Sequence, residues 1–316
     1  MRVTILDDYQ DCVRTLDAFK LLQGHDVTIL NDPARDRREL AGRLADAEAI
    51  VLIRERTRLD RELVDQLPRL RLVSQIGKVA AHIDLQACAE RGITVCEGEG
   101  TGGATAELTW ALVLASRRHL VDEANRLRAG DWQGSLGRQL RGSQLGIWGY
   151  GRIGRQVARY GQAFGMRVVV FGREASTAAA ANDGLEVATS RHEFFAGSDV
   201  LSLHLRLVAA TRGIVTAADL QAMKPSALLV NTSRAELVEP GVLVAALQAG
   251  RPGFAAVDVF EREPVLGADD PLLKLPNALC TPHLGYVERD NYERYFGIAF
   301  DNINAFAAGQ PRNVVA

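Results

Sequence analysis

The chain has 316 residues, a formal net charge of −2, 47% hydrophobic residues and 24% charged residues. It is long enough for two domains with their own cores, and its composition is that of a globular protein. The small net charge excludes the strongly basic surface that nucleic acids and membranes attract. No apolar run approaches the roughly 20 residues of a membrane span, so we expect neither a nucleic-acid nor a membrane partner.

Four cysteines, Cys12, Cys88, Cys96 and Cys280, stand without any C-x-x-C spacing. This arrangement indicates neither a metal site nor a disulfide framework, and it favours a reducing compartment. The first residues already form an apolar strand pattern, so we expect no signal peptide and a cytoplasmic location. The chain ends soon after the last helical pattern, so we expect no added regulatory domain.

Residues 1–98 alternate between strand and helix patterns. Apolar runs predict strands at 3–6, 27–30, 50–53, 72–75 and 94–96, and helical patterns lie between them, as at 37–44 and 60–67. This order predicts a small, doubly wound parallel α/β sheet. The glycine-rich segment 97–103 is typical of a hinge or domain boundary. A long helix is predicted at 104–128, ending at Gly130 as a C-cap, and a loop containing Trp132 at 131–142.

A second α/β unit is predicted from residue 143 to about 285. Strands are expected at 145–148, 168–171, 200–203, 227–230, 254–257 and 278–280, with helices at 191–195, 217–222 and 241–249. Six strands fit a dinucleotide-binding sheet. A last helix at 286–306 is expected to return and complete the first domain. We therefore predict a substrate-binding domain at 1–98 and 287–316 and a dinucleotide-binding domain at 99–286.

The turn after residues 145–148 carries a G-x-G-x-x-G motif made of Gly149, Gly151 and Gly154. The first glycine permits a tight turn, the second a close approach of a pyrophosphate, and the third close packing of helix on strand. The amides of Arg152 and Ile153 are expected at the helix N-terminus, which favours an anion. The alternative is a glycine turn without a ligand, but the two flanking strands favour a dinucleotide site.

The end of the second strand of this unit bears on the choice between NAD and NADP. An NAD site usually has an acid there for the ribose hydroxyls, but this chain has Gly172 followed by Arg173. A guanidinium can pair with a 2′-phosphate, which favours NADP modestly. In the alternative, Arg173 is simply solvated and Glu174 replaces the missing acid.

Three charged residues follow three later strands of the same sheet: Arg234, Glu263 and His283. Ligands of open α/β sheets bind outside the carboxyl ends of the strands. Each residue alone could be a surface arginine, a solvated acid or a capping histidine. Together at one edge of a cofactor sheet they predict a reaction site, since an imidazole can exchange a proton near neutral pH and a guanidinium can bind a carboxylate.

Four segments of the chain resemble the D-isomer-specific 2-hydroxyacid dehydrogenases, a family that includes phosphoglycerate, glycerate and formate dehydrogenases. They are GIWGYGRIGRQVARYGQAFGMRVVVF, LSLHLRLVAATRGIVTAADLQAMKPSALLVNTSRAELVE, AAVDVFEREP and TPHLGY. The resemblance covers nearly the whole chain in the family's order and spacing. It implies a Rossmann domain plus a smaller flavodoxin-like parallel α/β domain. The implied activity is the reversible NAD(P)H-dependent reduction of a 2-keto acid to a D-2-hydroxy acid.

The resemblance also implies roles for individual residues. Arg234 matches the arginine that clamps the substrate carboxylate and keto oxygen, His283 the acid/base, and Glu263 its hydrogen-bonding partner. Amides at Lys78 and Val79 match those that hold the carboxylate. Cofactor contacts are implied at the positions of His204, Thr232 and Asp258, the last of which receives the nicotinamide carboxamide.

Three positions depart from the family pattern. Ala235 replaces a glycine, Arg206 replaces a proline near the expected adenosine, and Gly172 replaces the ribose-binding acid. None of these removes a catalytic group, but the last two leave the cofactor preference open. By the same resemblance, the helix at 104–128 and the Trp132 loop are expected to form a homodimer contact.

Two other functions remain open on the sequence. One is a non-catalytic, nucleotide-sensing binding protein of the same fold, which would bind a partner without turnover. The other is a related nicotinamide enzyme, such as an amino-acid dehydrogenase or an adenosylhomocysteinase. The order of arginine, glutamate and histidine along the chain disfavours the second.

Overall fold

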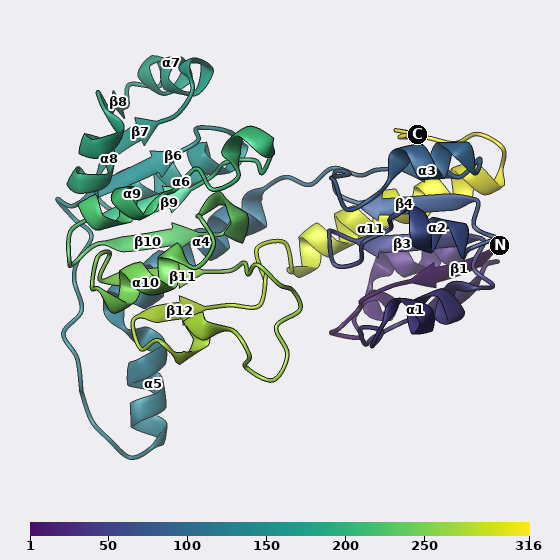
Figure 1. The fold of residues 1–316 in the computed structure, drawn as a ribbon, viewed down its shortest axis with the longest axis horizontal. Helices are drawn as coiled ribbons and strands as arrows, with labels where there is room; N and C mark the ends of the chain where they lie inside the picture. Colours follow the sequence, from purple (N-terminus) through teal and green to yellow (C-terminus); the bar gives the residue numbers. More distant parts are fainter. The chain divides into compact units, whose positions relative to one another are not determined.

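The computed structural model describes residues 1–316, which form two compact units. One unit contains Met1–Thr101 and Val287–Ala316, and the other contains Gly102–Tyr286. The chain therefore leaves the first unit once and returns to it for its last 30 residues, as the colours of Figure 1 show.

The first unit is built on five parallel strands in the order β2-β1-β3-β4-β5. This is the flavodoxin-like strand order, which confirms the predicted small α/β sheet. The strands are β1 Arg2–Ile5, β2 Asp26–Ile29, β3 Ala49–Ile53, β4 Leu72–Ile76 and β5 Thr94–Cys96. The α-helices are α1 Arg37–Leu44, α2 Arg61–Asp65, α3 Leu85–Glu90 and α11 Arg289–Ala307.

The central strands β3 and β4 are buried along their whole length, because helices cover both faces of a parallel sheet. The last helix, α11, supplies one of these covers and buries Phe296, Phe300 and Ile303. It begins at Arg289, three residues later than predicted, because the Glu288 side chain accepts hydrogen bonds from the amides of Asp290 and Asn291 and so caps the helix.

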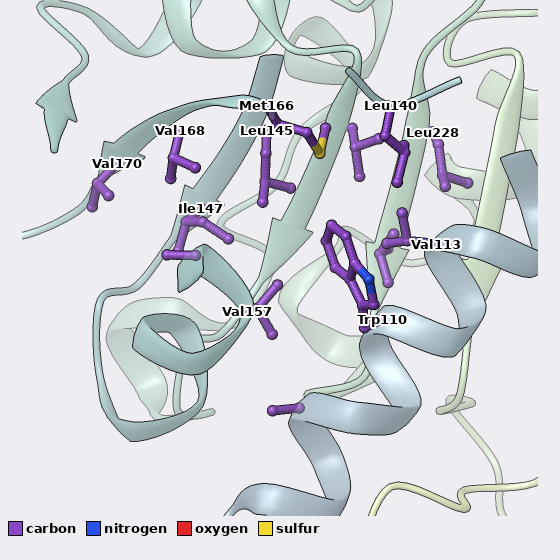
Figure 2. Packing of buried hydrophobic residues seen from close by; sticks show 14 of the residues in the cluster. Trp110, Val113, Leu140, Leu145, Ile147, Val157, Met166, Val168, Val170 and Leu228 are labelled. Carbon is purple, nitrogen blue, oxygen red and sulfur yellow. The ribbon is translucent and has the colours of Figure 1, made fainter. Parts of the chain in front are cut away.

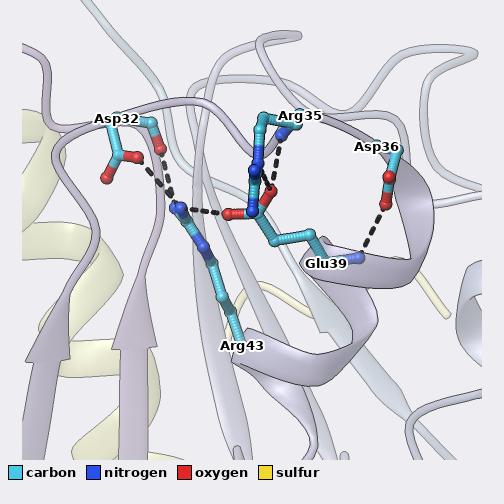
Figure 3. A network of polar contacts seen from close by, with 5 residues as sticks. All are labelled: Asp32, Arg35, Asp36, Glu39 and Arg43. Atoms are coloured by element: carbon cyan, nitrogen blue, oxygen red, sulfur yellow. Dashed lines mark hydrogen bonds and ion pairs between the residues drawn. The ribbon is translucent and has the colours of Figure 1, made fainter.

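The arginine-rich start of α1 is balanced by acids on the surface (Figure 3). Asp36 caps the helix by accepting from the Glu39 amide at 2.8 Å. Glu39 itself accepts from Arg35 at 2.8 Å and from Arg43 at 2.5 Å. The hydrogen bond from Arg35, with that from its amide, lowers the pKa of Glu39 to about 2. These arginines therefore serve the helix surface and leave no basic patch.

The second unit is built on seven parallel strands in the order β12-β11-β10-β9-β6-β7-β8. Strands β6 to β11 have the strand order of a Rossmann sheet, which confirms the predicted Rossmann domain. Six of the seven strands were predicted, and β8 was missed because its two residues carry no apolar run. The strands are β6 Gln144–Trp148, β7 Arg167–Phe171, β8 Glu186–Val187, β9 Val200–Leu203, β10 Leu228–Asn231, β11 Phe254–Val257 and β12 Ala278–Cys280.

Alternate residues of these strands enter two separate cores. On one face, Leu145 and Ile147 of β6 pack with Trp110 of helix α4 (Gly103–Arg118) and Val157 of helix α6 (Arg152–Ala163) (Figure 2). On the other face, Trp148 lies edge-on to Phe194 and Phe195 of α8 (Arg191–Gly197), and α9 (Ala217–Ala222) and α10 (Val242–Gln248) contribute to the same core. The helices of this unit are α4 Gly103–Arg118, α5 Leu120–Arg128, α6 Arg152–Ala163, α7 Glu174–Asn182, α8 Arg191–Gly197, α9 Ala217–Ala222 and α10 Val242–Gln248.

The prediction of a single helix at 104–128 is wrong, because the helix is interrupted at His119. That residue has a φ of 51°, in the left-handed region, and it ends α4 and starts α5. Its ring lies edge-on to Phe254 with the ring centroids 5.6 Å apart. None of the helices in either unit combines the length and the hydropathy needed to cross a membrane.

Candidate active site

The glycine turn between β6 and α6 is packed so tightly that two of its glycines admit no side chain. Gly149 has a φ of +100°, and a Cβ there would lie 2.6 Å from the carbonyl oxygen of His204. A Cβ on Gly154 would lie 2.2 Å from the carbonyl oxygen of Gly149. A Cβ on Gly151 would meet no atom within 4 Å, so the space above this residue is open to a ligand.

Helix α6 begins directly after Gly151, so its first amides, at Arg152 and Ile153, border that open space. Helix N-termini present N–H groups and a partial positive charge to anions. The turn therefore fits the pyrophosphate of a dinucleotide, by its shape as well as by its sequence.

His283 and Glu263 meet at the carboxyl edge of the seven-stranded sheet. The Nδ1 atom of His283 lies 2.6 Å from Oε2 of Glu263, while Oε1 of Glu263 accepts from the Phe260 amide at 2.9 Å. The imidazole also stands edge-on to the ring of Tyr286, with centroids 5.3 Å apart. Held at Nδ1 by a carboxylate, this ring can exchange a proton only at Nε2.

The backbone of His283 is in an unusual conformation that Asp258 helps to hold. The φ of His283 is 53°, and the two following amides, of Leu284 and Gly285, each donate to the Asp258 carboxylate at 2.7 Å. Thr281 donates its hydroxyl to the same carboxylate at 2.6 Å. Burial raises the pKa of Asp258, and these donors oppose that rise. Asp258 thus fixes the loop that carries the imidazole.

Arg234 follows β10, whose neighbours in the sheet are β9 and β11. Asn231 of β10 is in register with Val257, which is in register with Cys280 of β12. Neighbouring strands lie roughly 4.8 Å apart, so the segments that follow β10 and β12 are close enough for their long side chains to approach. Asn231 donates to the Arg234 carbonyl at 2.8 Å, and the Arg234 guanidinium donates to the Ser233 carbonyl at 2.6 Å.

Two threonines of helix α4 make hydrogen bonds to the loops that follow β10 and β12. The sequence interpretation missed both of them. The hydroxyls of Thr109 and Thr232 lie 2.7 Å apart, and Thr105 donates to the Gly285 carbonyl at 2.6 Å. Thr105 and Thr109 stand four residues apart on one face of α4. That spacing was visible in the sequence, but nothing in it indicated what the face contacts.

His204, Gly172 and Arg173 lie at the ends of the strands that flank β6. The Nε2 atom of His204 is 3.0 Å from the Ser202 hydroxyl, and burial lowers its pKa to about 4. Arg173 is exposed and precedes α7 as its N-cap residue. A Cβ on Gly172 would lie 3.2 Å from the Cβ of Ser176, so an acid there would have to displace Ser176 slightly.

Lys78 and Val79 belong to the other unit, in the loop after β4. Both contact Glu97, which follows β5. The Lys78 ammonium lies 2.6 Å from one oxygen of Glu97, and the Val79 amide donates to the other at 3.0 Å. The remaining predicted site residues all belong to the unit of Gly102–Tyr286. The contacts of Glu97 were not predicted.

Comparison with known proteins identifies the family. Residues 110–285 match the family described as D-isomer specific 2-hydroxyacid dehydrogenase, NAD binding domain. A glyoxylate reductase from Aeropyrum pernix is 39% identical over 269 residues, which are 82% of this chain and 80% of that protein. A hydroxypyruvate reductase from Blautia hydrogenotrophica is 30% identical over 100% of this chain and 99% of its own length.

The solved structures agree with this result. A phosphoglycerate oxidoreductase from Vibrio cholerae is 54% identical and superimposes with a TM-score of 0.96 over 98% of this chain and 99% of that one. The family match, the relatives and the glycine turn all indicate an oxidoreductase that uses NAD(P). The chain therefore belongs to the D-isomer-specific 2-hydroxyacid dehydrogenase family, whose members act on the CH–OH group of 2-hydroxy acids.

Proposed function

We propose that this enzyme reduces a small 2-keto acid to its D-2-hydroxy acid, with Arg234, Glu263 and His283 as catalytic residues. The observation that carries the proposal is the 2.6 Å contact between His283 Nδ1 and Glu263 Oε2 at the carboxyl edge of the cofactor sheet. When bound, the reduced nicotinamide supplies the hydride. The chain must supply the rest, namely a proton, a carboxylate-binding group and a polarised carbonyl.

His283 gives the proton in this scheme. As an imidazolium it donates its Nε2 proton to the oxygen that becomes the hydroxyl, while the proton on Nδ1 stays on the ring and is donated in a hydrogen bond to Glu263. Glu263 stabilises the charged ring and fixes its orientation, and the anchored amide of Phe260 fixes Glu263. In the oxidative direction the neutral ring accepts the same proton.

Arg234 is assigned to the substrate carboxylate and to the charge that develops on the keto oxygen. Its planar fork of donors suits both groups. The amides of Lys78 and Val79 are assigned to the carboxylate as well, as the family resemblance implies. Thr232 and Asp258 are assigned to the cofactor side, with Asp258 also holding the loop of His283.

Glyoxylate and hydroxypyruvate are the substrates that the relatives' names favour, and 3-phosphohydroxypyruvate is the alternative. A screen that follows the absorbance of NADH and NADPH with these three acids tests the proposal. We expect turnover with at least one acid and a kcat/KM at least roughly a thousandfold lower in a variant with Arg234→Gln. Binding of the nucleotide without any turnover would instead support the nucleotide-sensing alternative, which no observation so far favours.

We propose a preference for NADPH over NADH. Gly172 leaves no acid to hold or repel the ribose substituent, and Arg173 is exposed beside it, before the first turn of α7. A 2′-phosphate at this place would gain a guanidinium partner and the N-terminus of a helix. The ratio of kcat/KM values for the two nucleotides measures this preference.

A cytoplasmic homodimer completes the proposal. Helix α5 and the following segment expose apolar side chains: Leu127 is 61% exposed, Trp132 73% and Leu136 95%. Figure 1 shows both extending beyond the helices that cover the sheet. The four cysteines are free thiols, as is common in reducing compartments. Light scattering of the wild type and of a Leu136→Glu variant tests the dimer, which the variant should dissociate.

A further inference from the structure

The substrate loop of this enzyme already contacts a carboxylate, and that carboxylate belongs to the chain. Glu97 directly follows β5 at the carboxyl edge of the five-stranded sheet. Its Oε1 atom lies 2.6 Å from Nζ of Lys78, and its Oε2 atom accepts from the Val79 amide at 3.0 Å. The side chain is only 18% exposed. One carboxylate of the chain thus spans a main-chain amide and an ammonium of the same loop.

The backbone around Glu97 is anchored on both sides, so this contact is built into the fold. The Glu97 amide donates to the Asn313 carbonyl at 3.0 Å, and the Gly98 amide donates to the Gly77 carbonyl at 2.9 Å. A Cβ on Gly98 would lie 3.3 Å from the Gly77 nitrogen, which shows how closely the two segments approach. The backbone of Glu97 is therefore held in place beside the loop that carries Lys78 and Val79.

This contact conflicts with the assignment of the Val79 amide to the substrate carboxylate. A single N–H group has one strong hydrogen bond to give. Two carboxylates on the same nitrogen would lie within a few ångströms of each other and repel. The substrate carboxylate and the Glu97 carboxylate therefore exclude each other from this amide.

We propose that Glu97 is a specificity-determining residue that competes with the substrate carboxylate for the Val79 amide. The inference rests on the proposed function for its assignment of that amide. On substrate binding, Glu97 turns away from Val79 and stays paired with Lys78, whose flexible side chain can follow it. Glu97 thereby weakens the binding of every small 2-keto acid, and only acids with further contacts overcome it.

Two variants separate competition from support of the loop. Glu97→Gln keeps the size and an acceptor but removes the charge, and Glu97→Ala removes the competitor. Glu90→Gln is the matched control, because Glu90 pairs with Arg61 on the surface of the same unit. The probe is oxamate, an unreactive analogue of glyoxylate, titrated by calorimetry into each full-length enzyme with its nucleotide.

Glu97→Gln should bind oxamate about tenfold more tightly than the wild type. Its KM for the keto acid should fall by a similar factor with kcat within twofold, and Glu90→Gln should match the wild type. Unchanged or weaker oxamate binding in folded Glu97→Gln would overturn the proposal. If Glu97→Gln does not fold, the same measurement on Glu97→Ala tests the proposal instead. Absence of turnover in the wild type would contradict the proposed function but not the competition by Glu97, because oxamate binding requires no turnover.

Discussion

The two parallel sheets end in charged edges that are organised differently. At the edge of the seven-stranded sheet, Asp258 and Glu263 accept from main-chain amides and build the loop of His283. At the edge of the five-stranded sheet, Glu97 pairs with Lys78, and Asp7 accepts from the Thr57 hydroxyl and lies near Arg56. At the first edge, the acids fix the ring and the backbone of one histidine. At the second edge, Glu97 also accepts from a main-chain amide, but each acid has a cation beside it.

The largest test of this difference removes the guanidinium from the edge of the seven-stranded sheet. Arg234→Gln should lower kcat/KM at least roughly a thousandfold, because it loses both carboxylate binding and stabilisation of the keto oxygen. Steady-state kinetics with the best keto acid measures the effect. Arg212→Gln, an exposed arginine that pairs with Glu236, is the control. A loss of kcat/KM of less than tenfold in Arg234→Gln would contradict a role of Arg234 in the reaction.

A second test compares two buried aspartates, Asp258 at the first edge and Asp7 at the second. Asp258→Asn should lower kcat roughly 10- to 100-fold, because the loop of His283 loses one of the two oxygens that accept from its amides and shifts. It should also cost about 1–3 kcal/mol of unfolding free energy. Asp7→Asn, at the other edge, should change stability but leave kcat within a few fold. Urea denaturation and kinetics measure both, and equal losses of kcat would contradict the contrast between the edges.

The third test concerns His204, which also ends a strand of the seven-stranded sheet. Burial lowers its pKa from 6.5 to about 4, so the unfolded chain binds more protons between these values. Stability therefore falls as the pH drops through this window, by about 2 kcal/mol at pH 5 relative to pH 8. His204→Gln should lose that part of the pH dependence. Denaturation curves that shift equally with pH in both proteins would exclude this contribution.

The smallest expected effect concerns the cofactor. Arg173→Ala should lower the preference for NADPH over NADH about tenfold, through a higher KM for NADPH alone, because one charged hydrogen bond at an exposed site is lost. Arg159→Ala, on the neighbouring helix α6, is the matched control. If the ratio of the kcat/KM values for NADPH and NADH is unchanged in Arg173→Ala, Arg173 makes no contact with the nucleotide. It is then simply solvated, as in the alternative drawn from the sequence.

The sequence predicted what local patterns determine. Buried apolar runs marked five strands of one sheet and six of the other, and the residues after them include the pair that meets there, Glu263 and His283. It could not predict the two-residue strand β8, which is too short for a pattern, or the break at His119, since helical periodicity continues beyond that residue. The contacts of Glu97 and Thr109 arise only when distant segments pack, so no spacing along the chain indicated them.

The pairing of His283 with Glu263 is the centre of the account, and one substitution tests it most directly. His283→Asn suits the φ of 53°, because asparagine tolerates the left-handed region. The measurement is a single-turnover reduction of glyoxylate or hydroxypyruvate, with nucleotide binding followed by fluorescence. We predict unchanged nucleotide affinity and a rate roughly 10²- to 10⁴-fold lower. A rate within threefold of the wild type would contradict proton transfer by His283.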